Sequence, residues 1–400
     1  MFGAILLAYR YLIFERVKTA LLLCAMILVS SVIPAVQWTI RGFEQETRKR
    51  SETTPLVIGA PGSRFSLVLQ TLYFQGETLP RVRADQTEKI QEWQRGTAIP
   101  LYVRFKAQGY PIIGTTGDYF ELRGFSLSAG NPLERIGDCL IGSEVAESLG
   151  LKAGDRLLSD PENAFDLAGP SALNLRVQGV LNTTHSPDDH AVFCTLDTTW
   201  IIEGLGHGHQ PAAAVDRSHA ANDQQSVGNT SVATYHHAGG RENPQRFAEV
   251  TDDNVSSFHF HGSKDSFPIT SIIVTPESEK SAVILMGKFL EPDAKCQIVR
   301  TRDTVDEMMQ LIGRARRAVD IGGAVLMSIS LLLVGLVISL SLRLRQGEMQ
   351  TLKRLGAGRF DIVRLLTVEY AILGAISLTI GFVSAGWISG WALWWLRSLL

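Results

Sequence analysis

The sequence lacks an excess of either charge, since its 38 Lys and Arg residues are matched by 40 Asp and Glu residues. Nucleic-acid-binding proteins usually carry a basic excess, so we expect no nucleic-acid partner. The sequence also lacks Gly-x-x-x-x-Gly-Lys-Ser/Thr, the loop that cradles nucleotide phosphates; its one Gly-Lys pair is Gly287-Lys288. A Gly-x-Ser-x-Gly nucleophile elbow is missing too. We therefore expect a chain that is not an enzyme.

Cysteine is scarce, with four residues in the chain. Cys24 lies in an apolar run, where a thiol is no candidate nucleophile. Cys139, Cys194 and Cys296 lie in the polar middle of the sequence, and three thiols allow one disulfide with one cysteine left over. Their spacing favours no particular pair.

Long apolar runs dominate the two ends of the chain, at Thr19–Ile40, Val319–Leu342 and Leu366–Leu400. About 20 apolar residues cross the core of a bilayer, so each run is long enough to be a membrane helix. A signal peptide is the alternative for the first run, but its apolar region is only about 7–15 residues long. Because Thr19–Ile40 is longer and Gln37-Trp38-Thr39 is a poor cleavage site, we expect it to be retained.

Basic residues predict the orientation of these helices. Six Lys and Arg residues fall between Arg343 and Arg364, and short loops rich in Lys and Arg stay in the cytoplasm. The polar middle of the chain is then outside. Only three runs are apparent, and the tryptophans between Trp387 and Trp395 are typical of a membrane–water interface. We therefore expect the third helix to end outside.

The cytoplasmic loop has an apolar stripe of its own. Met349, Leu352 and Leu355 recur at helical spacing, and Gly356 follows as a helix terminator. A short amphipathic helix of this kind fits a groove of another protein. The pattern alone is equally typical of a basic loop that only fixes the topology.

The motif Arg-x-Gly-Glu348-Met-x-Thr-Leu-Lys-Arg-Leu-Gly356-Ala-Gly-Arg, followed by Leu-Leu-x-Val-Glu369, resembles the FtsX-like permease domain of MacB-type (type VII) ABC transporters. Gly117–Phe125 and Ile141–Val180 are similar to the family's periplasmic segments. The resemblance implies that the loop is a coupling helix, which seats on a separate ATPase. The coupling residues it implies are Glu348, Met349, Leu352, Lys353, Arg354, Leu355, Gly356 and Ala357.

The predicted fold is an α+β membrane protein. One N-terminal and two C-terminal transmembrane helices flank a large mixed α/β periplasmic domain on a helical stalk. The predicted segments are a cytoplasmic amphipathic lead-in (1–18), transmembrane helix 1 (19–41), the MacB-like periplasmic domain with its stalk helices (42–318), transmembrane helix 2 (319–342), the cytoplasmic coupling loop (343–365) and transmembrane helix 3 (366–400).

Inside the periplasmic domain, local patterns predict individual elements. Leu56–Gly59 and Phe65–Leu69 have the composition of strands, and Glu144–Leu149 that of a short helix. Thr304 and Glu307 have the spacing of a capping box, which predicts the start of the second stalk helix.

All nine histidines lie between His185 and His261. Residues 204–263 are rich in Gly, Asn, Ser, Ala and Asp, which predicts a flexible insertion. The pairs His207-x-His209 and His259-x-His261 are candidate ligands for zinc or another metal, with Asp188, Asp189, Asp252 and Asp253 as further donors. The alternative is a solvated loop in which histidine is one polar residue among many, and no spacing matches a closed structural site.

The resemblance implies the permease subunit of an ABC transporter in the bacterial inner membrane. Its expected partners are an ABC ATPase that binds the ATP, a second copy of the chain, membrane lipid and a periplasmic or outer-membrane protein. Its task would be export, extraction or mechanotransmission. Two alternatives are an FtsX-like regulator of a cell-envelope partner and a metal-handling protein built around the histidine loop.

Overall fold

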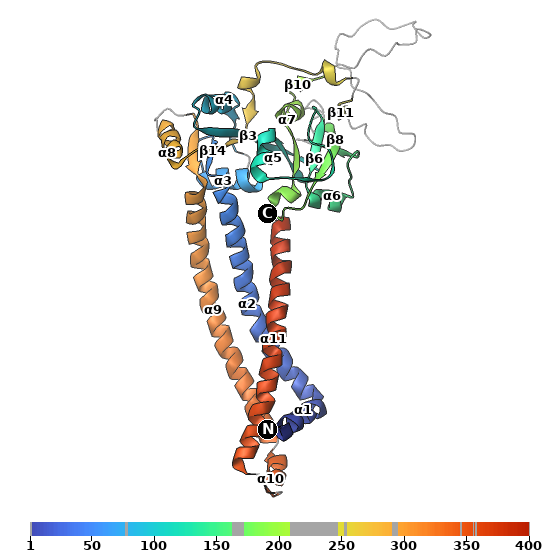
Figure 1. The fold of residues 1–400 in the computed structure, drawn as a ribbon, viewed down its shortest axis with the longest axis vertical. Coiled ribbons are helices and arrows are strands. Elements are labelled where there is room, and N and C mark those ends of the chain that lie inside the picture. Colours follow the sequence, from blue (N-terminus) through green and yellow to red (C-terminus); the bar gives the residue numbers. More distant parts are fainter. Residues whose placement is uncertain are drawn as a thin grey trace, which may run out of the picture. The chain divides into compact units, whose positions relative to one another are not determined.

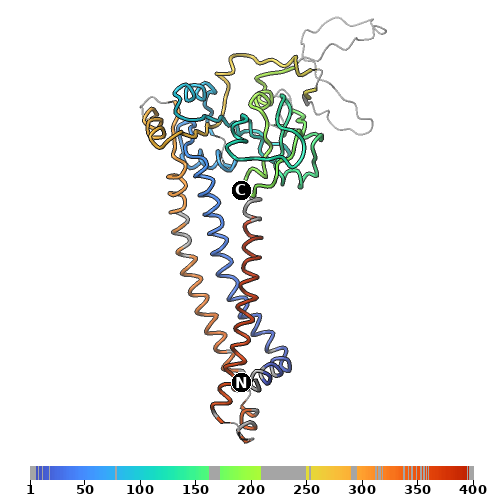
Figure 2. Tube along the Cα trace, in the orientation of Figure 1, coloured from blue at the N-terminus to red at the C-terminus, as the bar shows by residue number. Residues whose placement is uncertain are grey.

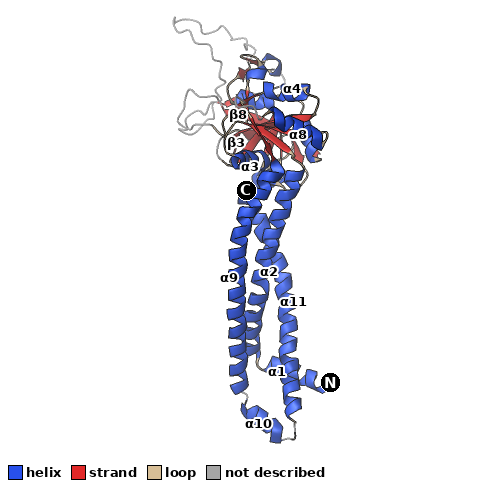
Figure 3. Ribbon diagram, turned by 90° about the vertical axis from the view of Figure 1, so that its left-hand side faces the viewer, coloured by secondary structure: helices blue, strands red, loops and turns tan. Residues whose placement is uncertain are grey.

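The computed structural model describes residues 2–76, 79–161, 172–208, 247–251, 254–289, 295–344, 346–354, 356 and 358–399 (Figure 2). The chain divides into two compact units. The first combines Met1–Glu46 with Met308–Leu399, and the second is Thr47–Glu307. The first unit is helical and the second contains the sheets, as Figure 3 shows by colour.

Long apolar helices make up the first unit, as predicted. Among the described residues, three stretches are long and apolar enough to cross a membrane: Thr19–Glu52, Val319–Leu340 and Phe360–Leu393. They belong to long helices that run past the predicted membrane boundaries. The described helices of this unit are α1 (Phe2–Phe14), α10 (Gln346–Arg354), α11 (Arg359–Leu399) and most of α2 (Arg16–Glu52) and α9 (Thr301–Leu344). The end of α2 and the start of α9 belong to the second unit.

The last apolar run forms one continuous helix, α11. Within the helical unit α11 packs closely on α2. A Cβ at Gly381 would lie 2.0 Å from the Ser30 Oγ, so only glycine fits there. The Ser30 hydroxyl donates to the Ser377 carbonyl oxygen at 3.1 Å, and Trp38 meets Phe382 edge to face. Small residues and interhelical hydrogen bonds are the usual means by which helices associate in lipid.

The second unit is built on one large sheet, several of whose strands are labelled in Figure 1. Its described strands follow the order β11-β8-β6-β9-β4-β3-β14-β1-β15, with β5 and β7 also paired to β8. Parallel and antiparallel pairs are mixed in it. The strands are β1 (Leu56–Gly59), β3 (Gly96–Ala107), β4 (Tyr110–Thr115), β5 (Leu127–Gly130), β6 (Asp138–Ile141), β7 (Arg156–Leu158), β8 (Ala172–Leu181), β9 (Val192–Thr195), β11 (Phe247–Glu249), β14 (Ser271–Pro276) and β15 (Gln297–Arg300).

Among the described residues, six α-helices, three short 3-10 helices and two small ladders complete this unit. The helices are α3 (Arg64–Tyr73), α4 (Asp85–Glu92), α5 (Gly117–Arg123), α6 (Ser143–Leu149), α7 (Leu196–Ile202) and α8 (Glu279–Lys288). The ladders pair β2 (Val82–Arg83) with β13 (Pro268–Ile269), and β10 (Gly206–His207) with β12 (His259–Phe260). Both ladders join segments far apart in sequence.

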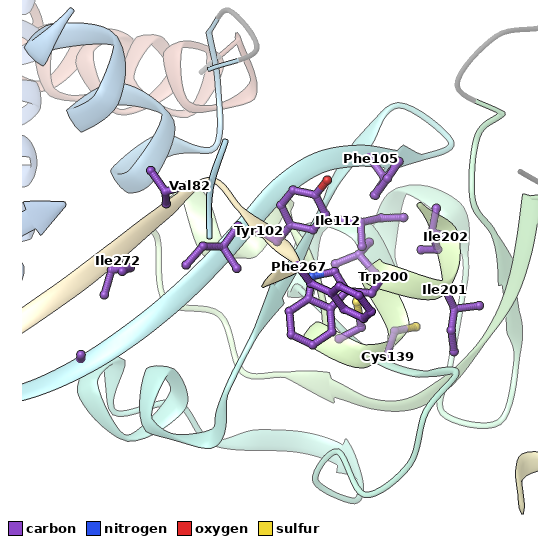
Figure 4. Packing of buried hydrophobic residues seen from close by; sticks show 14 of the residues in the cluster. Val82, Tyr102, Phe105, Ile112, Cys139, Trp200, Ile201, Ile202, Phe267 and Ile272 are labelled. Atoms are coloured by element: carbon purple, nitrogen blue, oxygen red, sulfur yellow. The ribbon is translucent and has the colours of Figure 1, made fainter. Parts of the chain in front are cut away.

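Strand β3 connects the two halves of the sheet. Its first half, from Gly96 to Leu101, pairs with β14, and its second half, from Tyr102 to Ala107, pairs with β4. Side chains at the join are buried: Tyr102, Ile112, Trp200 and Phe267 gather there in Figure 4. Burial of each large apolar side chain contributes about 1.5–3 kcal/mol, so this cluster stabilises both halves together.

The prediction of a strand at Phe65–Leu69 is wrong, because these residues lie in helix α3. Val68 and Leu72 are four residues apart and both are buried, which is the spacing of one helix face. The Ser63 side chain caps the helix by accepting a hydrogen bond from the Ser66 N–H.

The predicted capping box at Thr304 is wrong as well. Helix α9 begins at Thr301, so Thr304 is inside its first turn and not at the cap. The Thr304 side chain is buried there, and its hydroxyl donates to the Arg300 carbonyl oxygen.

The prediction that residues 204–263 form one flexible insertion is wrong at both ends. Strands β10, β11 and β12 fall inside this range. Strand β10 pairs with β12, and β11 adds a parallel strand to β8. Backbone hydrogen bonds of these ladders fix the two ends of the insertion. Residues 209–246 lie outside the described part of the chain.

Candidate functional site

The predicted coupling loop contains a nine-residue helix, α10, between the long helices α9 and α11. Within α10 the Met349 side chain is half-buried, while Gln350 and Arg354 are exposed. Glu348, Leu352 and Lys353 belong to α10, but their side chains are not described. Leu355 and Ala357 lie outside the described residues.

A glycine turn follows α10, as the sequence predicts. Gly356 has a φ of +90°, a conformation that residues with a Cβ rarely adopt. The Gly358 N–H donates to the Asp361 carboxylate at 3.2 Å, and Asp361 lies in the first turn of α11. A carboxylate in the first turn also suits the helix dipole. The chain thus holds a short helix between two apolar helices, followed by Gly356 in a left-handed conformation.

A buried ion pair ties the end of α2 into the sheet domain. Arg50 is in the last turn of α2, and Asp188 belongs to a 3-10 helix, Pro187–His190. The Arg50 Nη1 lies 2.5 Å from one Asp188 carboxylate oxygen and the Nη2 lies 3.1 Å from the other. The side chains are 7% and 1% exposed, so water screens the pair very little.

Further contacts satisfy the remaining polar atoms of this pair. The Tyr119 hydroxyl donates to Asp188 at 2.7 Å, and the Ser186 hydroxyl donates to its other oxygen at 2.8 Å. The Arg50 Nε donates to the Leu72 carbonyl oxygen at 2.5 Å, and the guanidinium lies over the Phe74 ring. We call Arg50, Tyr119, Ser186 and Asp188 the junction cluster.

The charge of Asp188 is stabilised strongly. Burial by itself would raise the pKa of this carboxyl, but attraction and hydrogen bonding to Arg50 outweigh it and lower the pKa to about 2. Burial raises the pKa of the Tyr119 hydroxyl to about 12, so it remains protonated and donates to Asp188. The junction cluster is therefore an ionised, fully paired contact at neutral pH.

The sequence suggested Asp188 as a candidate metal donor. This interpretation is wrong, because both oxygens of its carboxylate already accept hydrogen bonds from Arg50, Tyr119 and Ser186. Asp189 is also committed, since it accepts the N–H groups of Thr184 and His185. Asp252 and Asp253 lie outside the described residues. The sequence offered no signal for the junction cluster because Arg50 and Asp188 are 138 residues apart.

Three of the four candidate metal-binding histidines meet in space. His207, His259 and His261 can each offer a ligand atom, and these atoms all lie within 4.8 Å of one another. All three side chains are exposed. We call them the histidine cluster. His209, the fourth candidate, lies outside the described residues.

Both regions of this architecture match known protein families. Residues 19–234 match the MacB-like periplasmic core domain, and residues 321–399 match the FtsX-like permease C-terminal domain. The chain belongs to the FtsX/MacB-type family of ABC transporter permeases. The α+β fold with N-terminal and C-terminal apolar helices confirms the predicted fold class.

Solved structures of periplasmic or extracellular domains are similar to this permease at low identity. The periplasmic region of MacB from Actinobacillus actinomycetemcomitans is 9% identical, with a TM-score of 0.34 over 64% of this chain and 92% of that one. The extracellular domain of the noncanonic ABC-type transporter YknZ from Gram-positive bacteria is 8% identical, with a TM-score of 0.32 over 61% and 98%. No curated protein sequence matches the chain.

The three candidate sites fall in different parts of the two matched regions. Helix α10 lies inside the FtsX-like match, and the junction cluster lies inside the periplasmic core match. Of the histidine cluster, His207 is within the core match, whereas His259 and His261 fall between the two matched regions. The histidine cluster is thus built partly from residues that neither family match covers.

Proposed function

We propose that this permease couples ATP hydrolysis on a separate ABC ATPase to its periplasmic domain. The observation that carries the proposal is helix α10, a short helix between two membrane-length helices within the FtsX-like match. The apolar residues Met349, Leu352 and Leu355, which recur at helical spacing in the sequence, suit a groove on the ATPase. ATP is bound and hydrolysed by that partner, since members of this family are generally non-catalytic permeases.

Two helices carry the motion to the sheet domain in this proposal. Helix α9 begins at Thr301, directly after strand β15, so no flexible linker separates the helix from the sheet. Helix α2 is continuous to Glu52, and its last turn enters the junction cluster through Arg50. In this proposal the end of α2 passes displacement to the sheet domain through a buried, paired contact and not through a loop.

The working unit in this proposal is two permease chains and two ATPase chains in the bacterial inner membrane, because a single coupling helix serves one ATPase subunit. The motion drives export, extraction or mechanotransmission in the periplasm. An FtsX-like regulator would use the same coupling helix but a different periplasmic partner. Affinity purification separates the two, since an exporter recovers cargo or an outer-membrane protein and a regulator recovers a cell-wall hydrolase.

The test uses a charge in the apolar stripe of α10. Leu352→Asp should abolish co-purification of the ATPase while the full-length chain still inserts into the membrane. Gln350→Asp is the matched control, because Gln350 is exposed on the same helix and the substitution adds the same charge. Recovery of the ATPase with Leu352→Asp as efficiently as with Gln350→Asp would refute the coupling role.

A further inference from the structure

We propose that the histidine cluster binds one divalent metal ion of the zinc class at the β10–β12 ladder. His207 lies on β10 and His259 on β12, while His261 follows β12 directly after Phe260. The ring centroid of His207 lies 4.7 Å from that of His259 and 4.8 Å from that of His261. This inference is independent of ATPase coupling.

The strand register explains why the three imidazoles share one face. In an antiparallel ladder, residues two apart point to the same side, and paired residues face each other across the strands. His259 and His261 are two apart, and His207 is the register partner of His259. Residues far apart in the sequence are thereby placed as a triad.

The opposite face of the ladder is built from glycine and aromatic residues. A Cβ at Gly206 would lie 2.7 Å from the Phe260 ring, and a Cβ at Gly208 would lie 2.4 Å from the Phe258 ring. The Phe260 ring meets the Trp200 ring edge to face, with centroids 6.4 Å apart, and lies tilted against the Phe267 ring at a centroid distance of 5.9 Å. The aromatic face of the ladder packs against the domain core, so the three histidines on the opposite face point outward together.

The donor atoms are close to the spacing a tetrahedral metal requires. Zinc–nitrogen bonds of about 2.0–2.1 Å place two tetrahedral ligand atoms about 3.3–3.4 Å apart. The His207 Nδ1 and His261 Nε2 are 3.1 Å apart. Since all three rings are exposed, small side-chain rotations bring the third nitrogen from within 4.8 Å to that spacing.

A backbone contact orients one of the ligands. The His259 Nδ1 lies 3.2 Å from the Ser257 carbonyl oxygen. An Nδ1–H that donates to this carbonyl makes Nε2 the lone-pair nitrogen, which is the arrangement that backbone carbonyls usually impose on metal-binding histidines. Three imidazoles leave one tetrahedral position for water or a ligand from outside the chain, and imidazole donors favour zinc, copper and nickel over magnesium or calcium.

The test measures binding of Zn²⁺ to the full-length permease in detergent, by competition with a chromophoric chelator. All variants carry Cys24→Ser, because Cys24 is an exposed thiol. His207→Gln/His261→Gln removes two ligands and keeps polar side chains. His185→Asn is the control, since His185 is outside the cluster and has a φ of +56°, which asparagine tolerates.

We expect one tight Zn²⁺ per chain in the parent and in His185→Asn, and at least a tenfold weaker affinity in the double variant. Co²⁺ substituted at the site should show the intense visible absorption of a tetrahedral complex, and the double variant should lose it. Thermal unfolding of the metal-free proteins shows whether the double variant is folded. Equal Zn²⁺ affinity and equal Co²⁺ spectra in the double variant and the control would overturn the proposal, as would the absence of tight binding in the parent.

Discussion

The junction cluster permits a quantitative prediction. Arg50→Met keeps much of the aliphatic length of the side chain but removes both bonds to Asp188, the bond to the Leu72 carbonyl and the contact with the Phe74 ring. Asp188 is then a buried carboxylate with two hydroxyl donors and no directly paired cation among the described residues, although Arg123 still attracts it from over the Tyr119 ring. Removal of one partner of a buried pair typically destabilises a protein by about 3–5 kcal/mol.

This loss of stability should be visible in thermal unfolding of the full-length permease. For a domain of this size about 1 kcal/mol shifts the melting temperature by about 2–4 °C, so Arg50→Met should lower it by roughly 6–20 °C. Circular dichroism at a wavelength sensitive to β-sheet follows the unfolding of the periplasmic domain. The measurement is made at neutral pH, where Asp188 is ionised.

A matched control separates burial from charge. Arg48 lies two residues earlier on α2 and pairs with Asp306 at 3.3 Å, but the two side chains are 53% and 38% exposed. An exposed pair contributes only about 0–1 kcal/mol, so Arg48→Met should change the melting temperature little. If Arg50→Met and Arg48→Met are equally mild, the junction cluster does not anchor α2.

Three further predictions follow from the cited contacts. The pKa of Asp188, about 2, lies below the ordinary value of about 3.9, so the contribution of Asp188 to stability is complete above about pH 4 and is lost as the pH falls towards 2. Asp188→Asn should remove this part of the acid sensitivity, and an unchanged dependence of the melting temperature on pH in this variant would contradict the prediction. In a Cys24→Ser background, cysteine at Trp395 should react with an impermeant thiol reagent in intact inner-membrane preparations that expose the periplasmic face, whereas cysteine at Gly347 should react only after lysis; the reverse labelling pattern would overturn the topology. The buried Cys139, Cys194 and Cys296 should not react in this assay, because burial raises the pKa values of their thiols. Cys139 and Cys194 are register partners on β6 and β9, so oxidation should link these two and spare Cys296, which non-reducing peptide mapping checks; a bridge to Cys296 would contradict the register.

The membrane helices could be predicted from the sequence because each is a local pattern. A run of about 20 apolar residues needs no tertiary partner to be recognised, and the basic loop and Gly356 after α10 are equally local. Phe65–Leu69 shows the limit of such reasoning. A short apolar run does not distinguish a strand from a helix, and the decisive cap at Ser63 lies outside the run.

The sheet order and the sites depend on non-local pairing, which one sequence does not reveal. Residue composition predicted the strand at Leu56–Gly59, but it does not say that β3 joins both halves of the sheet. His259-x-His261 was visible in the sequence as a candidate ligand pair, whereas the position of His207 across from His259 is set by strand register. In the sequence, Arg50 is simply one of several basic residues at the end of a helix.

The most direct test of ATPase coupling is the hydrolysis rate of the partner ATPase, reconstituted with the full-length permease in lipid nanodiscs. The parent and Gln350→Asp should stimulate ATP hydrolysis over the ATPase alone, and Leu352→Asp should leave it at the uncoupled rate while its periplasmic domain melts normally. Stimulation by Leu352→Asp equal to that of the parent would contradict the account.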